Sequence, residues 1–234
     1  SDKIAISFGG SGLMMIWQFG VAHALAQERS LMERVERVHG TSGGAIAAYL
    51  LLEQPERLTD CVAHYTNRDF FDGLKLRDVV SPHDALLRRT FARLDLLRPG
   101  AAARLGGRFV AHGTSFAGGR PANVAVDVAE DGDVLDAISA SCCFDLSGVD
   151  VDGETLWDGG LSEPLSPDST LPTLEVSIIS GDAHVSPGAA RPMAADEAPK
   201  HPFLRYDWSP PNAAALAEAA CLTPARAQYR FDQG

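Results

Sequence analysis

The sequence predicts an α/β fold, a three-layer α/β/α sandwich with a mostly parallel central sheet. Two observations point to it. Short apolar runs that read as strands alternate with longer apolar runs that read as helices, an order that favours a parallel or mixed sheet covered by helices. Two of the strand-to-helix junctions, residues 9–12 and 40–44, are rich in glycine. The 234 residues, 45% of them hydrophobic, suit one domain over 1–234 with a sizeable core.

The elements follow from where these apolar runs begin and break. Predicted strands lie near 3–8, 35–39, 122–128, 155–158 and 174–180. Predicted helices lie near 13–27, 43–54, 56–69, 82–95, 133–141, 212–221 and from 224 onward. One helix starts at a capping box, Ser81-Pro82-His83-Asp84, with proline at the first helical position. Six prolines between 182 and 211 predict a loop-rich lid or wrapping segment.

The second glycine-rich junction has the pattern of a nucleophile elbow. Gly40-Thr41-Ser42-Gly43-Gly44 follows a predicted strand and opens a predicted helix, which is the setting that a G-x-S-x-G motif requires. Small neighbours let the backbone turn tightly and let a substrate carbonyl approach the serine. The N–H groups of Gly43 and Gly44 then point toward developing negative charge. Ser42 is therefore a candidate nucleophile.

The first glycine-rich junction, Gly9-Gly10-Ser11-Gly12, offers backbone N–H groups to an anion. It is not a phosphate-binding P-loop, since no G-x-x-x-x-G-K-[ST] occurs, and Met15 replaces the third glycine of a dinucleotide fingerprint. An oxyanion hole fits better, because acyl transfer needs two or three preorganised donors near the serine. The candidate donors are Gly10, Ser11, Gly12 and Gly43.

A third motif completes a family resemblance. Asp158-Gly159-Gly160 ends a predicted strand, and together with the two glycine clusters it resembles the patatin-like phospholipases in order and approximate spacing. Residues 7–13 followed by Gly20-Val21, and the small residues 137–141 followed by Phe144, also resemble that family, so that the likeness covers about residues 3–182. The resemblance implies a patatin-type fold and a serine–aspartate dyad, with Ser42 as nucleophile and Asp158 as its base. It implies acyl-ester or lipid hydrolysis with no metal and no cofactor.

Two departures from the family pattern lie near this site. Leu13-Met14-Met15-Ile16 is apolar where many members carry Arg or Lys, and Cys142-Cys143 stands where many members have proline. Met14, Met15, Cys142 and Cys143 are therefore candidate substrate contacts, with core packing as the alternative.

Other interpretations of the motifs remain open. An α/β-hydrolase would use Ser42, Asp158 and His184 in that order, but it builds a longer sheet before its nucleophile than the two strands available here. The same dyad could serve an acyltransferase, thioesterase or cyclase that acts on a carrier-bound or CoA-bound acyl chain. A non-catalytic lipid-binding module is a further alternative. His39 and His23 are expected to be packed or hydrogen-bonded histidines.

Charge and cysteine content narrow the partners and the compartment. The net charge of −11 disfavours nucleic acid. Residues 85–108 run against this trend with six arginines and one aspartate, so they dock an acidic or phosphorylated partner or form a solvated helix face; the arginines are Arg88, Arg89, Arg93, Arg98, Arg104 and Arg108. No apolar run reaches the length of a transmembrane span. Four cysteines without a C-x-x-C motif predict reduced thiols in a cytoplasmic protein.

Overall fold

The architecture comes from a computed structural model that describes residues 2–67, 70, 87–126, 128, 130–179, 183–187 and 230–232. Within these residues seven strands form one sheet: in the series β5, β6, β3, β2, β1, β7 each strand is hydrogen-bonded to the next, and β4 also pairs with β3. The strands are β1 (Ile4–Phe8), β2 (Val35–Thr41), β3 (Phe109–Ser115), β4 (Ala122–Val126), β5 (Val149–Val151), β6 (Glu154–Asp158) and β7 (Thr173–Val176). The helices are α1 (Met15–Gln27), α2 (Arg29–Met32), α3 (Gly43–Glu53), α4 (Leu58–Tyr65), α7 (Arg89–Arg93), α8 (Ala101–Leu105) and α9 (Asp131–Ser141). Short 3-10 turns are η1 (Gly12–Met14), η2 (Pro55–Arg57) and η4 (Gly159–Leu161).

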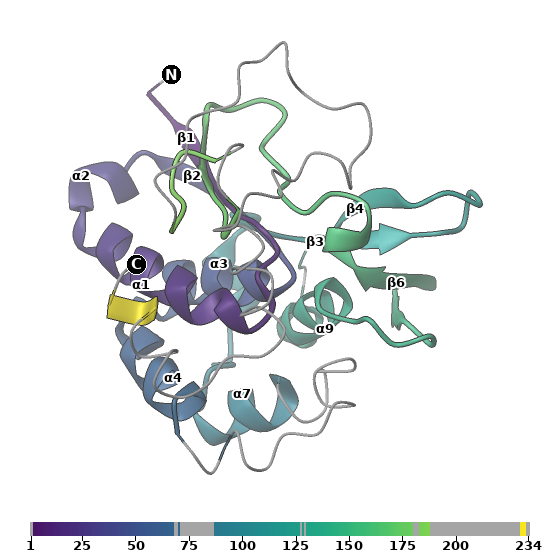
Figure 1. The fold of residues 1–234 in the computed structure, drawn as a ribbon, viewed down its shortest axis with the longest axis horizontal. Helices are drawn as coiled ribbons and strands as arrows, with labels where there is room; N and C mark the ends of the chain where they lie inside the picture. The colour runs from purple at the N-terminus through teal and green to yellow at the C-terminus, as the bar shows by residue number, and fades with distance from the viewer. Residues whose placement is uncertain are drawn as a thin grey trace.

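The fold is mixed α/β with a central sheet flanked by helices, which confirms the predicted class (Figure 1). β1 pairs in parallel with β2 and β7, and β2 pairs in parallel with β3. The pairings of β3 with β4, of β3 with β6 and of β5 with β6 are antiparallel. The sheet therefore has the expected parallel centre and, in addition, an antiparallel edge that projects beyond the helices in Figure 1.

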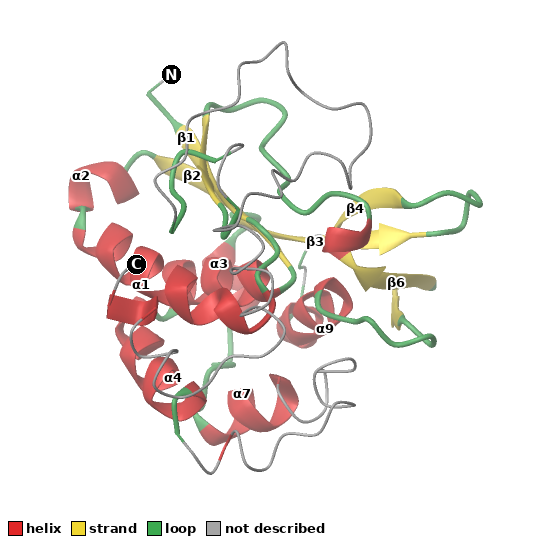
Figure 2. Ribbon diagram, in the orientation of Figure 1, coloured by secondary structure: helices red, strands yellow, loops and turns green. Residues whose placement is uncertain are grey.

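In the view of Figure 2, helices α1, α3, α4, α7 and α9 lie below the central strands. Helix α3 is buried over residues 43–51 because its sequence is apolar all round, and it packs between α1 and strands β1 and β2. Helix α9 contacts β3, β5 and β6. On the opposite face of β1 and β2, the loop after η4 contacts Ser7 and His39, two side chains that point away from α3.

Four elements escape prediction, and β3 is the most consequential. Its sequence, Phe-Val-Ala-His-Gly-Thr-Ser, is polar and small in its second half, yet all seven residues are buried. A strand buried on both faces is normally recognised by a continuous apolar run, which β3 lacks. Elements α2, α8 and β5 have three to five residues each, too few to show a period.

Some boundaries differ, and some expectations lie outside the described residues. The helix expected near 56–69 is the turn η2 followed by α4, and the strand expected near 174–180 is Thr173–Val176. Of the helix expected near 82–95, the described part contains α7. The capping box at 81–84, the helices expected at 212–221 and from 224, and most of the expected lid at 182–211 fall outside the described residues.

Helix α3 begins so close to the end of β1 that its second residue must be glycine. A Cβ added to Gly44 would lie 2.4 Å from the Phe8 carbonyl oxygen and 2.5 Å from that of Gly9. Both neighbours are backbone atoms, so the helix or the strand has to move. We expect Gly44→Ala to lower the free energy of unfolding by about 2–3 kcal/mol. Urea unfolding measures this, with Gly132→Ala as the control, since no atom lies within 4 Å of that site. Equal stability of the two variants contradicts the close packing.

Candidate active site

Strand β3 brings Ser42 and Asp158 together, although 116 positions separate them in the sequence. On one edge of β3, Thr41 of β2 pairs with His112 and Asp158 of β6 pairs with Gly113. β2 and β6 thus lie end to end along consecutive residues of the same strand. Because β2 runs parallel to β3 and β6 antiparallel, their carboxyl ends meet, and the elbow after β2 faces the aspartate that ends β6.

The elbow holds Ser42 in a strained conformation. Its φ of 54° and ψ of −131° are unusual for a residue other than glycine. The Ser42 N–H donates to Ser141 Oγ at 2.8 Å, and that hydroxyl donates to the His112 carbonyl at 2.6 Å. Ser141 therefore ties the elbow to β3 from helix α9. The sequence shows Ser141 only as one of several small residues, so its hydrogen bonds could not be foreseen.

Asp158 is a buried carboxyl with one oxygen left unsatisfied. Its Oδ1 accepts the Gly160 N–H at 2.8 Å, while Oδ2 has no hydrogen-bond partner among the described residues. Burial raises the pKa of Asp158 to about 7, although interactions with Ser42 and with the Gly160 N–H lower it in part. The contact with Ser42 falls short of a formed hydrogen bond, as is common for catalytic pairs without substrate. A carboxyl with this pKa can accept a proton near neutral pH.

This pKa predicts the pH profile of ester hydrolysis for Asp158 in its expected role as the base. A base works only when it is deprotonated, so kcat/KM for a soluble ester should fall about tenfold per pH unit below about pH 7. Initial rates between pH 5 and 9 in buffers of constant ionic strength measure the profile. A profile that stays flat down to pH 5 contradicts the raised pKa of Asp158.

The glycine loop at residues 9–12 lies directly beside the serine. A Cβ on Gly10 would lie 3.7 Å from the Ser42 Cβ, and a Cβ on Gly43 would lie 2.6 Å from Ser11 Oγ and 2.8 Å from the Gly12 carbonyl oxygen. Gln18, fully buried on α1, braces the loop: its Nε2 donates to the Gly9 carbonyl at 2.8 Å and its Oε1 accepts from Ser11 Oγ at 2.7 Å. Gln18 thus holds the loop in place beside Ser42.

Comparisons with known proteins identify the family of the chain. A sequence profile described as "Patatin-like phospholipase" matches residues 6–169, more than half of the chain. The chain belongs to the patatin-like phospholipase family. It is 24% identical over 191 residues to human "Patatin-like phospholipase domain-containing protein 4", covering 79% of this chain and 75% of that protein. A solved structure, "Crystal structure of VipD from Legionella pneumophila", aligns at 13% identity with a TM-score of 0.47, over 76% of this chain and half of VipD. Membership of a phospholipase family indicates a hydrolase that acts on lipid acyl groups.

The four candidate substrate contacts of this patatin-like chain are buried. Met14 and Met15 belong to the hydrophobic core, and the Met15 Cβ lies 3.1 Å from the position of a Gly43 Cβ. The Cys143 carbonyl accepts the Asp158 N–H at 2.7 Å. Burial raises the pKa of the Cys142 thiol well above its usual value, and the Asp158 charge adds to this effect. The two cysteines are thus buried neighbours of Asp158, and a direct contact with substrate stays a prediction.

Other candidates lie elsewhere. His184 accepts the Glu175 N–H through Nδ1 at 3.2 Å beside β7, which is separated from β6 by β3, β2 and β1 in the series of paired strands. His39 is buried and hydrogen-bonded, as expected. Three arginines of the basic segment form ion pairs within the chain: Arg88 with Asp136, Arg98 with Glu56 and Arg104 with Glu53.

The described residues include no helix that is both long enough and apolar enough to cross a membrane. They also contain three of the four cysteines, Cys61, Cys142 and Cys143, each as a free thiol.

Proposed function

We propose that the protein is a serine acyl hydrolase that cleaves acyl esters through an acyl-Ser42 intermediate. The observation that carries the proposal is the buried carboxyl of Asp158 beside Ser42, which lies on a strained elbow. This carboxyl has a pKa of about 7, and its Oδ2 has no hydrogen-bond partner among the described residues. A base whose pKa lies near neutral pH, next to a serine hydroxyl that must lose its proton, matches the requirements of covalent acyl transfer.

In the proposed reaction the Ser42 Oγ attacks the ester carbonyl carbon while Asp158 Oδ2 takes the hydroxyl proton. The tetrahedral intermediate collapses, the bond to the leaving alcohol breaks, and Asp158 returns the proton to the alcohol oxygen. Water then attacks the acyl-enzyme as Asp158 takes a proton from it. Collapse of the second intermediate restores the Ser42 hydroxyl and releases the acid.

The oxyanion is assigned to the N–H groups of Ser11, Gly12 and Gly43. Within the described part of the chain none of these three donates to another group. The Gly10 N–H, in contrast, donates to the Pro164 carbonyl at 2.7 Å. The Gly10 N–H, which the sequence suggested as an oxyanion donor, is therefore assigned to holding the loop in place. Ser11 and Gly12 are the proposed donors of this loop.

Hydrolysis is favoured over transfer to another acceptor. Residues 85–108 are the part of the sequence expected to dock an acidic or phosphorylated partner such as an acyl carrier, and three of their arginines pair with carboxylates of the chain itself. A lipid-binding module without catalysis gives no reason for a strained serine beside a carboxyl of raised pKa.

Product analysis tests the proposal. Purified protein is incubated with soluble esters of increasing acyl length, with and without glycerol as a competing acceptor, and products are identified by mass spectrometry. We expect the free acid as the main product under both conditions. Glyceride as the main product would assign the enzyme to the transferases, and the absence of any Ser42-dependent product would refute the proposal.

A further inference from the structure

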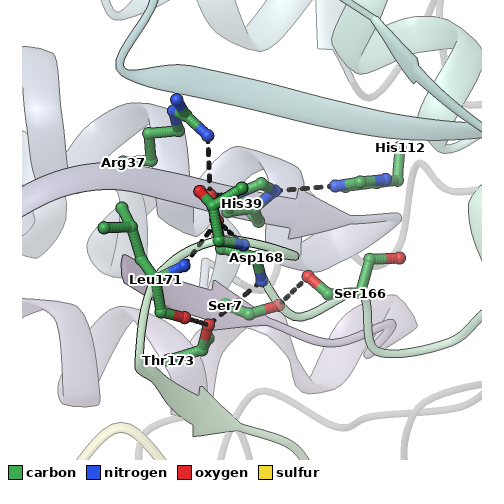
Figure 3. A network of polar contacts seen from close by, with 9 residues as sticks. Ser7, Arg37, His39, His112, Ser166, Asp168, Leu171 and Thr173 are labelled. Carbon is green, nitrogen blue, oxygen red and sulfur yellow. Dashed lines mark hydrogen bonds and ion pairs between the residues drawn. The ribbon is translucent and has the colours of Figure 1, made fainter. Parts of the chain in front are cut away.

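A buried polar network lies on the face of the sheet opposite α3, outside the dyad (Figure 3). Its centre is Asp168, whose side chain is 1% exposed. Asp168 belongs to residues 162–172, here named the bridging segment, which directly follows η4 and therefore the catalytic end of β6. Nothing in the proposed chemistry uses this network.

The bridging segment holds the glycine loop in place. The Pro164 carbonyl accepts the Gly10 N–H at 2.7 Å, and a Cβ on Gly9 would lie 3.0 Å from the same oxygen. Two residues later the Ser166 carbonyl accepts the Ser7 hydroxyl at 2.8 Å. The position of the candidate oxyanion donors beside Ser42 thus depends on where the bridging segment lies over β1.

Asp168 fixes the bridging segment with both of its carboxyl oxygens. Oδ1 accepts the backbone N–H groups of Thr170 at 2.7 Å and Leu171 at 2.9 Å, which closes the turn. Oδ2 accepts from His39 Nε2 and from the Arg37 guanidinium, both at 3.0 Å. Burial alone would raise the pKa of Asp168, yet these hydrogen bonds hold it well below its usual range, so the carboxylate is charged.

The partner histidines belong to the two strands that carry the elbow. His39 lies three residues before Ser42 on β2, and its Nδ1 lies 2.9 Å from His112 Nε2 on β3. The two rings stack with centroids 5.2 Å apart. The carbonyl of His112 accepts the hydrogen bond from the Ser141 hydroxyl, and that hydroxyl in turn accepts the hydrogen bond from the Ser42 N–H. The network therefore joins the elbow and the bridging segment through one pair of imidazoles.

The positions of the protons on His39 and His112 decide which contacts of the network are hydrogen bonds. The Asp168 carboxylate only accepts, so His39 Nε2 carries a proton, and a neutral His39 accepts the His112 Nε2 proton at Nδ1. Burial lowers the pKa of both histidines, which favours these neutral forms. His112 Nδ1 then faces Asn123 Oδ1 at 3.2 Å with no proton between them, and this contact is longer than those of His39 with His112 and with Asp168. The hydrogen bond from His39 to Asp168 is therefore the contact that ties the bridging segment to β2.

We propose that Asp168 and His39 are positioning residues that set the oxyanion loop through the bridging segment. The inference rests on the proposed hydrolase function. Asp168 holds His39 of the elbow strand, the segment carries Pro164, and Pro164 holds Gly10, whose neighbours donate to the oxyanion. Because oxyanion donors act chiefly on the transition state, a loosened segment slows turnover more than it weakens substrate binding.

Two variants and one control test this. Asp168→Asn keeps an acceptor for the turn at Thr170 but removes the carboxylate from His39, and His39→Phe removes the same contact from the other side while it keeps a ring of similar size. Tyr49→Phe is the matched control, because it deletes a buried hydrogen bond to the Leu96 carbonyl on the α3 side of the sheet. Soluble-ester kinetics and amide hydrogen exchange at Gly10 are the readouts.

We expect both variants to lower kcat by about 10- to 100-fold with KM within about twofold, and to lose protection at Gly10. Tyr49→Phe should keep wild-type kcat and protection. A folded Asp168→Asn variant with wild-type kcat and a protected Gly10 amide overturns the inference, and if that variant does not fold, the same result in His39→Phe does so. Because exchange at Gly10 needs no catalysis, this outcome is distinct from a failure of the hydrolase proposal, which would appear as wild-type protein without Ser42-dependent turnover.

Discussion

Ser42→Ala should lower kcat for ester hydrolysis by about 10⁴- to 10⁶-fold and leave the fold intact. The substitution removes the oxygen atom that carries the acyl group in the proposed reaction. It costs little structure, because the elbow is held through the Ser42 N–H and the Ser141 hydroxyl, neither of which changes. Steady-state kinetics on a soluble ester measure the rate, and thermal unfolding measures the fold.

Ser139→Ala is the matched control for this variant. Ser139 is equally buried, lies on α9 two residues from Ser141, and its hydroxyl has no hydrogen-bond partner among the described residues. Alanine at this position should keep full activity. If Ser42→Ala retains more than a few per cent of wild-type turnover while Ser139→Ala behaves normally, Ser42 is not the nucleophile.

Asp158→Asn should lower kcat by about 10³-fold or more, since asparagine has a similar shape but cannot take the serine proton. The Oδ1 atom of asparagine can still accept the Gly160 N–H, which keeps the turn after β6. The loss should therefore appear in kcat at pH 8 with the fold preserved. Near-normal activity of this variant excludes a dyad in which Asp158 is the base.

The same variant should be more stable than wild type at alkaline pH. With a native pKa of about 7 and an ordinary value of 3.8, Asp158 keeps in the folded state a proton that the unfolded chain releases between those values. Wild-type stability therefore falls as pH rises from about 4 to about 7, and the full cost is present above pH 7. Asp158→Asn removes this cost, and we expect a gain of about 1–3 kcal/mol at pH 8 and almost none at pH 4. Urea unfolding at both pH values measures the difference, and a gain that does not depend on pH contradicts the buried charge.

The elements with strong local signals could be predicted from the sequence. The turn from β1 into η1 and α1, and the turn from β2 into α3, are marked by glycines between apolar runs, and the structure has both. The motif around Asp158 could be located as the end of a strand. The parallel centre of the sheet follows from these βα repeats.

The geometry of the site could not be predicted, because it depends on β3. That strand carries His112, Gly113 and Thr114 in its middle, so no apolar or alternating pattern reveals it. Only through its pairings do the ends of β2 and β6 meet. The contact between His39 and Asp168 spans 129 residues and depends on a loop crossing the sheet, a property with no local signal.

The rate at which a long-chain fluorophosphonate labels Ser42 tests directly whether this serine is a nucleophile that Asp158 activates. Wild type, Asp158→Asn and Ser42→Ala are treated in parallel, adducts are followed by intact mass, and the labelled residue is identified by peptide mapping. We expect one adduct per chain at Ser42 of the wild type, labelling slowed about 100-fold or more in Asp158→Asn, and no adduct in Ser42→Ala. An adduct on a different residue, or equal labelling rates in wild type and Asp158→Asn, would contradict an Asp158-activated nucleophile at Ser42.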